Sequence, residues 1–489
     1  MDILDALSDR DRGAKFTLEV DEIDLPGDLE TPVSAFLKLQ PIGARFLLES
    51  AEDPRSVGRY TFIGIDPLLR IEIRDQDTLI SSDGANLAVP HTSEKAPFDG
   101  LRLILDRFEI SNRSETPLLG GLAGYASYEL VKFFEPKMAG LLAESDWPIG
   151  LFYFVDKLLV FDHYMRRMRL VRLRYQGQPL HSGNEPVDLE QIRLALHRTT
   201  VRADVDPIIA EPGYTSNFTP HEFESAVEKI RRHISGGDIF QAVLSQREER
   251  LSPVASFNIY RALRMLNPSP YMYYLDFNGI ELIGSSPEAL VKLHDGMATV
   301  RPIAGTRRRG RDLQADQRMA EELVHDEKER AEHVMLIDLA RNDLGKVCQF
   351  GSINVPAMFQ LEFYSHVMHL TSSVTGRLRN DCDHFDLLRA TFPAGTVSGA
   401  PKLRAMEIIA ELEQSARGPY AGAVGYFSLS GDLDMCITIR TVVKRNGRLL
   451  LQAGAGIVAD SEPAREYLET RNKIAAPKEA ISDAEEGRL

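Results

Sequence analysis

The sequence predicts a mixed fold of the α+β class, in which helices accompany antiparallel strands. Residues 219–235 and 326–345 have the pattern of helices, and residues 423–453 contain the strand patterns and turn signals of hairpins. The composition suits a folded soluble protein, because 43% apolar and 26% charged residues are ordinary values for that class.

The helix expected at residues 219–235 has signals at both ends. Thr219 is suited to cap its N-terminus, Pro220 is suited to its first turn, and Gly236-Gly237 ends it. Apolar side chains recur from Phe223 to Ile230 at a spacing that places them on one face. A folded block therefore begins at about this helix.

Three strand patterns follow one another near the C-terminus. They are Ala423–Leu429, Met435–Val443 and Leu449–Ala453, and turn signals at Gly431-Asp432 and Asn446-Gly447 separate them. Short strands joined by glycine-containing turns are typical of antiparallel hairpins. We therefore expect these three strands to be neighbours in one sheet.

Alternation within Met435–Val443 predicts two unlike faces. Ile437 and Ile439 fall on one face, and Thr438 and Arg440 fall on the other. The face with the arginine is either an ordinary exposed face or the lining of a cavity, and the alternation by itself favours the exposed face.

Length and linker composition predict two blocks, at residues 15–175 and 219–477. Between them, Gln176–Pro186 is polar and contains glycine and proline, as surface loops do, and Leu189–Leu196 has the pattern of a short helix. We expect the two blocks to be separate domains.

Charge and cysteine content exclude several classes of protein. The net charge of −15 argues against nucleic acid as a partner, since nucleic-acid-binding proteins carry basic faces. No apolar run approaches the roughly 20 residues that cross a bilayer, and the acidic N-terminus lacks the apolar core of a secretory signal. Cys348, Cys382 and Cys436 have neither disulfide nor zinc spacing, which fits a cytoplasmic protein.

Two pairs of glutamates point to a metal site. Glu329 and Glu332 are three residues apart in one expected helix, as are Glu466 and Glu469 in another. This spacing puts each pair on one helix face, where like charges repel unless a cation lies between them. Oxygen ligands suit Mg²⁺. The alternatives are a transition-metal site that includes His333 and a charged solvent face.

Two glycine-containing stretches offer groups that bind anions. Pro302-Ile-Ala-Gly-Thr306 presents a backbone amide and a hydroxyl at one point, which is enough to hold a carboxylate. Gly454-Ala-Gly456, after the third strand pattern, lets a ligand approach the backbone N–H groups. Together with the glutamates, they suggest a divalent metal above an anionic small molecule.

Basic and titratable residues add weaker signals. The arginines of Thr306-Arg-Arg-Arg-Gly-Arg311 indicate either a phosphate-binding run or a solvated loop. His366 and His369 can act as acids or bases near neutral pH. Alternation places these histidines on opposite faces of a strand, so we expect only one of them to line a cavity.

Taken together, these stretches resemble the chorismate-utilising enzymes. The matching motifs occur in the order of that family and cover about residues 219–477. They are Asp238-Ile-Phe-Gln-Ala-Val-Leu-Ser-Gln-Arg247, Gly284-Ser-Ser-Pro-Glu288, Pro302-Ile-Ala-Gly-Thr-Arg307, Asp338-Leu-Ala-Arg-Asn-Asp343, Pro393-Ala-Gly-Thr-Val-Ser-Gly-Ala-Pro-Lys402, Gly454-Ala-Gly456 and Glu469-Thr-Arg-Asn-Lys473. The resemblance implies large antiparallel sheets flanked by helices, with the first block packed on the second.

Within this family, the chain most closely resembles the branch that forms anthranilate and pyruvate from chorismate and ammonia, the first step of tryptophan biosynthesis. Gln241 stands where the water-adding isochorismate and salicylate synthases have a lysine base, so the resemblance makes ammonia the nucleophile. Ala304 stands where many aminodeoxychorismate synthases have a nucleophilic lysine. The resemblance also implies feedback inhibition by tryptophan, which would be bound by Ser50, Pro270, Tyr271 and Met272.

The family pattern assigns further roles by position. It makes Glu332 and Glu469 ligands of Mg²⁺, with Glu329 and Glu466 behind them. The positions that match chorismate contacts are Gly305, Thr306, Tyr420, Arg440, Gly454, Ala455, Gly456 and Lys473. The catalytic positions are Gln241, Glu288 as the general acid for loss of the C4 hydroxyl, and His369 in the elimination of pyruvate.

The resemblance also implies a partner, because we find no glutamine-hydrolysing segment with a Cys-His-Glu triad in the sequence. We expect a separate glutamine amidotransferase subunit to deliver ammonia within a hetero-oligomer. Three alternatives remain: an aminodeoxychorismate synthase component that serves folate synthesis, a non-catalytic tryptophan-binding scaffold, and a protein that binds nucleic acid through its arginine run.

Overall fold

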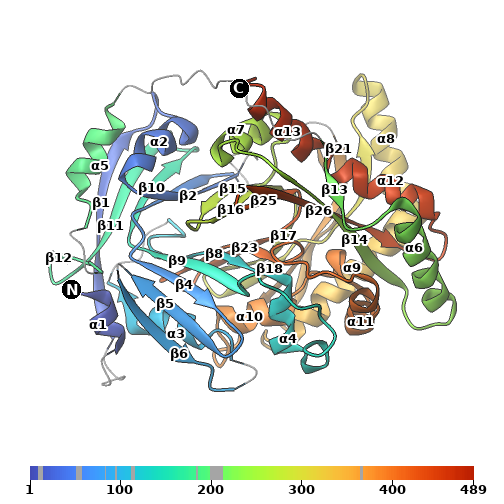
Figure 1. Cartoon of the computed structure of the whole chain (residues 1–489), viewed down its shortest axis with the longest axis horizontal. Coiled ribbons are helices and arrows are strands. Elements are labelled where there is room, and N and C mark those ends of the chain that lie inside the picture. The colour runs from blue at the N-terminus through green and yellow to red at the C-terminus, as the bar shows by residue number, and fades with distance from the viewer. Residues whose placement is uncertain are drawn as a thin grey trace.

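The computed structural model contains two large β-sheets that lie face to face, with helices on their outer sides (Figure 1). The structure describes residues 1–8, 15–50, 58–82, 84–93, 96–111, 116–182, 186–198, 213–363 and 367–488, apart from the side chains of Thr306 and Val367. Large antiparallel sheets flanked by helices confirm the α+β prediction. No helix in these ranges is long and apolar enough to cross a membrane.

The larger sheet has 14 strands in the described part of the chain, and strands from both predicted blocks lie within it. Its neighbours are antiparallel except β1 and β7. In spatial order the strands are β13 (Thr215–Ser216), β14 (Gln241–Leu251), β26 (Arg448–Ile457), β25 (Thr441–Arg445), β16 (Ile280–Ser286), β15 (Tyr271–Asp276), β2 (Ala44–Glu49), β3 (Tyr60–Ile65), β10 (Lys157–Asp162), β11 (Arg167–Tyr175), β1 (Phe16–Pro26) and β7 (Phe108–Ile110), with β12 (Gln178–Pro179) beside β11 and β22 (Gly399–Ala400) beside β14.

The smaller sheet has 12 strands in the same described ranges and is likewise shared between the blocks. In spatial order the strands are β19 (Ile303–Arg308), β21 (Val367–Arg377), β18 (Met297–Val300), β17 (Ala289–His294), β24 (Leu433–Ile437), β23 (Ala423–Ser428), β8 (Gly121–Ala126), β9 (Gly150–Val155), β4 (Leu69–Ile73), β5 (Asp77–Ser82) and β6 (Ala85–Pro90), with β20 (Asn354–Phe363) beside β21. The blocks are joined where β2 pairs with β15 and β8 pairs with β23.

Helices cover the outer faces of both sheets because each has one apolar face. Over the smaller sheet pack α1 (Ile3–Ser8), α3 (Asp99–Arg107), α4 (Val131–Phe134), α9 (Glu327–Gly345) and α10 (His384–Thr391). Over the larger sheet pack α2 (Pro32–Leu39), α5 (Leu189–Leu196), α7 (Ser256–Leu266) and α13 (Ala475–Glu485). Around β14 and β26 pack α6 (Pro220–Ser235), α11 (Lys402–Leu412) and α12 (Pro463–Lys473), while α8 (Leu313–His325) precedes α9.

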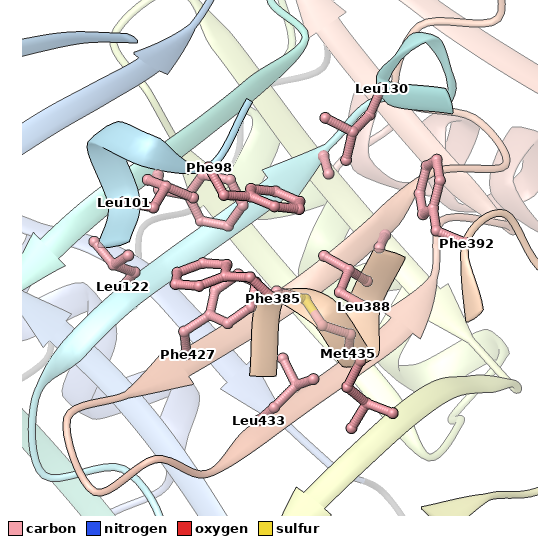
Figure 2. Close-up of a cluster of buried hydrophobic side chains, with 14 of the residues drawn as sticks. Phe98, Leu101, Leu122, Leu130, Phe385, Leu388, Phe392, Phe427, Leu433 and Met435 are labelled. Carbon is pink, nitrogen blue, oxygen red and sulfur yellow. The ribbon is translucent and has the colours of Figure 1, made fainter. Parts of the chain in front are cut away.

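Aromatic side chains join the two blocks on the outer side of the smaller sheet (Figure 2). The Phe98 ring beside α3 stacks on the Phe385 ring of α10, with 5.1 Å between centroids, and Phe385 also packs on Phe427 of β23 at 4.6 Å. Arg102 of α3 adds an ion pair of 2.7 Å with Asp383, which caps α10. Apolar and polar contacts thus connect α3 of the first block to α10 of the second.

The helices expected at residues 219–235 and 326–345 are confirmed. Thr219 caps α6 in a reciprocal pair of hydrogen bonds with Glu222, and Gly236 follows the last turn. Asp326 caps α9, which runs on to Gly345 as one helix. Local capping and spacing are enough to predict such elements, because their determinants lie within a few residues.

The expected strand Met435–Val443 is wrong, because the structure divides it. β24 ends at Ile437 in the smaller sheet and β25 begins at Thr441 in the larger sheet, so 438–440 cross between the layers. Arg440 has a left-handed backbone, with φ of 50°. A residue in that conformation breaks an extended strand.

Gly454-Ala-Gly456 was expected after a strand, but it lies within β26. Gly454 pairs with Ser245 and Gly456 pairs with Val243 of β14. Pairing with β14 therefore extends this strand to Ile457. Gly454 and Gly456 continue the hydrogen-bonded pairing of the sheet, and their lack of side chains leaves space over one face of β26.

Candidate active site

A cavity of about 300 Å³ lies where β26, β19, β21 and the 438–440 crossing meet. Nine residues selected from the sequence line it: Glu288, Gly305, Glu332, His369, Tyr420, Arg440, Gly454, Gly456 and Lys473. They come from positions as distant as 288 and 473, so only the tertiary structure brings them together. Further lining residues include Ala304, Thr396, Val397, Ile439 and Gln452.

Two further selected residues, Gln241 and Glu469, lie beside this cavity. Gln241 forms a hydrogen bond with Glu332, and Glu469 is 2.7 Å from the Lys473 ammonium. Ala455 is buried against α6 and α11, because alternation along β26 turns its side chain away from Gly454 and Gly456. Thr306 lies in β19, but its side chain is outside the described residues.

Glu288 is placed to give a proton near neutral pH. It follows β16 at the cavity wall, where burial raises the pKa of its carboxyl to about 7. Thr396 donates a hydrogen bond of 2.7 Å to its Oε1, and the positive charge of Lys473 lies near enough to oppose part of the pKa rise. A carboxyl with this pKa is half protonated at pH 7 and can serve as a general acid.

Arg440 presents a positive charge to the cavity. Among the described residues no carboxylate forms an ion pair with it, and burial lowers the pKa of its guanidinium without removing its charge at neutral pH. Tyr420 lines the same wall, and its hydroxyl is close to Gly454. A ligand carboxylate here would satisfy a guanidinium that the protein leaves without a counter-ion.

The acidic pairs of α9 and α12 converge at the mouth of the cavity. Burial raises the pKa of Glu332, and so do the charges of Glu329 and Glu469. Burial and then the charge of Glu469 raise the pKa of Glu466 as well. Arg307 forms an ion pair of 3.0 Å with Glu329, and Lys473 forms one of 2.7 Å with Glu469.

This donor set fits a hard cation such as Mg²⁺. Burial, and then the charges of Glu329 and Glu469, raise the pKa of Glu332, and a cation between these carboxylates would relieve the repulsion. Within the described ranges, no three acidic, histidine or cysteine side chains form a complete metal site. Two protein carboxylates with water and substrate oxygens are typical of Mg²⁺. His333 is buried and bonds Ser372 through Nε2 at 2.6 Å, so the site with His333 receives no support.

His369 lies in β21 beside the glycine-containing strand β19. Its Nδ1 is 3.2 Å from the carbonyl oxygen of Gly305, and burial lowers the pKa of its ring. The ring is therefore neutral at pH 7, and Nδ1–H donates to that carbonyl. His366, the other candidate, lies outside the described residues.

A second cavity lies between the two sheets, and Ser50, Pro270, Tyr271 and Met272 all line it. The pairing of Met272 with Glu49 in β15 and β2 brings the two sequence motifs together. Its charged lining residues are Glu49, Lys292 and Asp434; the last two are 3.1 Å apart, and Tyr271 donates a hydrogen bond of 2.9 Å to Asp434. Sequence reasoning missed Lys292 and Asp434, since they reach this cavity only through the smaller sheet.

Comparisons with known proteins identify related sequences and structures. A family model described as chorismate binding enzyme matches residues 43–479. Anthranilate synthase component 1 of Acetivibrio thermocellus is 43% identical over 95% of this chain and 96% of its own length. The same enzyme of Aquifex aeolicus is 44% identical over 94% of both chains.

Two solved structures are also similar to this chain. Anthranilate synthase component I from Streptococcus pneumoniae superposes with a TM-score of 0.73 at 35% identity and covers 86% of this chain and 92% of its own. The menaquinone-specific isochorismate synthase from Escherichia coli has a TM-score of 0.69 at 21% identity over 98% of both chains, and this likeness concerns the fold alone.

Proposed function

The chain belongs to the chorismate-binding enzyme family, and we propose that it is the lyase that converts chorismate and ammonia into anthranilate and pyruvate. The single observation that carries this proposal is the composition of one cavity. It combines an arginine that forms no ion pair among the described residues, a carboxyl with a pKa of about 7, and Glu332, whose charge interacts with that of Glu469 beside the cavity.

The cavity has a counter-charge for each carboxylate of chorismate. We propose that Arg440, which lines the cavity with Tyr420, binds one of these carboxylates with two parallel hydrogen bonds. Mg²⁺ held by Glu332 and Glu469 would bind the ring carboxylate and offset its charge. Lys473, which donates a 2.9 Å hydrogen bond to the Gly454 carbonyl, adds a second fixed positive charge.

The residues of the cavity account for direct addition of ammonia. Ala304 offers no amine that could form a covalent intermediate, and Gln241 offers no base that would activate water. The ammonia nitrogen bonds to the ring while the bond to the C4 hydroxyl breaks, and that hydroxyl leaves as water with the proton of Glu288. Neutral His369 serves the later elimination, in which the ring loses a proton, the bond between the ring and the enolpyruvyl oxygen breaks, and the released enolpyruvate gains a proton to become pyruvate.

We expect the ammonia to come from a separate glutamine amidotransferase subunit in the cytoplasm, where the three free thiols stay reduced. The test is an assay of the purified chain with chorismate, Mg²⁺ and either ammonium or glutamine, followed by fluorescence and mass. Ammonium alone should give anthranilate. Glutamine alone should not, and robust product from glutamine would contradict the partner proposal.

Two further results of the same assay would overturn the main proposal. A product that retains the enolpyruvyl group would identify an aminodeoxychorismate synthase instead. Unchanged turnover in Glu332→Gln would favour a scaffold without catalysis, because that glutamate lies in the cavity.

We also propose that tryptophan binds the second cavity and inhibits the enzyme. Phe62 and Tyr426 provide apolar walls for an indole ring, and Lys292 with Asp434 provides charges for its amino and carboxylate groups. The cavity is connected to the catalytic one through β24, because the Ile437 N–H donates to the Glu288 carbonyl at 3.0 Å. Tryptophan can thus favour a state with a looser chorismate site.

Ser50→Ala and Met272→Thr should weaken tryptophan inhibition more than they reduce catalysis. Both residues line the second cavity and neither lines the catalytic one. The inhibition constant and kcat/KM should be measured on the same preparations. Equal loss of inhibition and catalysis would count against a separate regulatory cavity.

A further inference from the structure

We infer that Thr396 is a positioning residue for Glu288: its hydroxyl orients that carboxyl and decides which of the two oxygens carries the catalytic proton. The inference rests on the proposed function, in which Glu288 is the general acid. Thr396 lies in the short helix η4 (Gly395–Val397), within a matched motif, yet the family pattern assigned it no role here.

The contact itself is the first argument. The Thr396 hydroxyl donates a 2.7 Å hydrogen bond to Oε1 of Glu288. The backbone of Glu288 is held by Ile437, whose N–H donates to its carbonyl at 3.0 Å. Among the described residues, no other side chain forms a hydrogen bond with the carboxyl, so Thr396 is the donor that can fix its orientation.

The chemistry of a neutral carboxyl gives the second argument. Such a group has one O–H, and the oxygen that accepts a hydrogen bond behaves as the carbonyl oxygen. Because Oε1 accepts from Thr396, the proton resides on Oε2. Without the hydroxyl the two oxygens become equivalent, and the proton is aimed correctly only part of the time.

A smaller cavity behind Glu288 gives the third argument. Glu288 and Thr396 line both this cavity and the catalytic one, so they form the partition between the two. The other walls of the smaller cavity are mainly apolar, from Leu290, Leu336, Leu339, Ala340 and Ala394. A carboxyl released by Thr396 has room to turn into this space, away from the substrate.

The turn that carries Thr396 is itself anchored. The Val397 carbonyl accepts a 2.7 Å hydrogen bond from buried Arg417, and the Ser398 carbonyl accepts one of 2.9 Å from the Val243 N–H. A Cβ added at Gly395 would lie 2.1 Å from Leu339 of α9, so the turn packs closely on that helix. The hydroxyl is therefore preorganised before substrate arrives.

Other charged groups face Glu288 from the elements around it. In the catalytic cavity they are Lys473, Arg440, His369 and Glu332, and in the smaller cavity they are Arg301 and Asp343. None of them changes in a Thr396 variant, so an altered pH profile would report on the hydroxyl. The hydrogen bond from Thr396 lowers the pKa of Glu288, and its removal should raise that pKa.

The test compares Thr396→Val with Thr396→Ser in ammonium-dependent turnover between pH 5.5 and 9. Thr396→Val should lower kcat roughly 10- to 100-fold with little change in KM. It should also move the alkaline fall of kcat upward by about half a pH unit or more. Thr396→Ser keeps the donor and should restore both values toward those of wild type.

Thr391→Val is the matched control. Thr391 lines the smaller cavity, but its hydroxyl bonds the carbonyls of Leu387 and Leu388 in α10 instead of Glu288. It should leave the midpoint of the pH profile unchanged. An unchanged midpoint in Thr396→Val, or in Thr396→Ala if the valine variant does not fold, would overturn the inference.

An infrared measurement separates failure of this inference from failure of the proposed function. The pH-difference spectrum of the free protein should contain a protonated-carboxyl band that Glu288→Gln removes and Thr396→Val shifts. If wild type makes no anthranilate, the proposed function fails while the band still reports the contact. If wild type is active and the band does not shift, only the role of Thr396 is rejected.

Discussion

At the residue scale, the site uses groups that are costly for the fold. Glu288 keeps its proton in the folded protein up to about pH 7, whereas an exposed glutamate loses it near pH 4.5. Because the pKa is higher in the folded than in the unfolded protein, protonation of Glu288 stabilises the fold fully below about pH 4.5. That contribution is lost as pH rises through about 7. The property that makes Glu288 an acid therefore makes it destabilising at pH 8.

We expect Glu288→Gln to separate stability from activity. The amide of the variant does not titrate, so its stability should not fall as pH rises. The difference in free energy of unfolding, variant minus wild type, should therefore be about 2 kcal/mol larger at pH 8 than at pH 5. Anthranilate formation should nevertheless fall at all pH values. Urea unfolding at both pH values measures the first effect, and a gain that does not depend on pH would contradict the assigned pKa.

Arg440 should likewise favour activity at the expense of stability. Its guanidinium is desolvated at the cavity wall without a carboxylate partner, so Arg440→Met should stabilise the fold by up to about 1 kcal/mol. The same change should raise KM for chorismate at least about tenfold, since a bidentate carboxylate contact is lost. Thermal unfolding and steady-state kinetics on one preparation measure both effects.

Arg417→Met is the matched comparison for this prediction. Arg417 is also buried, but it pairs with Glu413 at 2.7 Å and donates to the carbonyls of Val397 and Val243. Its loss leaves a buried carboxylate without its partner and should cost roughly 3 kcal/mol or more. Destabilisation of similar size in both variants would argue against a special role for Arg440.

At the element scale, strand β26 forms the floor of the cavity because two of its residues lack side chains. A Cβ at Gly456 would lie 2.6 Å from the Gln241 amide nitrogen, and one at Gly454 would lie 2.8 Å from the Tyr420 hydroxyl. The strand thus holds both neighbours at their present positions. Gln241 in turn forms a hydrogen bond with Glu332, so a side chain at position 456 would also affect the pair Glu332 and Glu469.

Gly456→Ala should therefore reduce kcat/KM by about tenfold or more while the protein stays folded, because small displacements of positioned groups are costly in catalysis. The obstacle is the end of a flexible side chain, which can move aside. Gly140→Ala is the control, since a Cβ there meets nothing within 4 Å. Equal activity in both variants would show that the position of Gln241 is unimportant.

At the scale of the whole molecule, the two blocks are interleaved. The pairings β2 with β15 and β8 with β23 run through the middle of both sheets, and Tyr273 and Tyr426 pack in the core between them. Separation would expose two strand edges on each block and the aromatic core that they border. The second cavity also draws walls from both blocks.

We therefore expect residues 213–488 not to fold when they are expressed without the first block. The whole chain should show one cooperative thermal transition by circular dichroism, since the blocks share both sheets. The isolated segment should show none. A cooperative transition in that segment would demonstrate an independent catalytic domain and contradict this expectation.

Much of the local structure could be predicted from the residue pattern. The cap of α6 and the hairpin turns depend on neighbours a few residues away, so they could be predicted from the sequence. The two glutamate pairs could also be recognised from the sequence, because each pair lies within one turn of a helix. Their meaning as one site came from the resemblance to a family, which carries information that spacing does not.

The rest depended on contacts between distant segments. Alternation could not reveal that the chain leaves one sheet for the other at 438–440, or that Ala455 faces α6 and α11 while Gly454 and Gly456 face the cavity. Thr396 gained its meaning only from its contact with Glu288. Sequence periodicity reports which side of an element is apolar, whereas pairing between remote strands decides what that side meets.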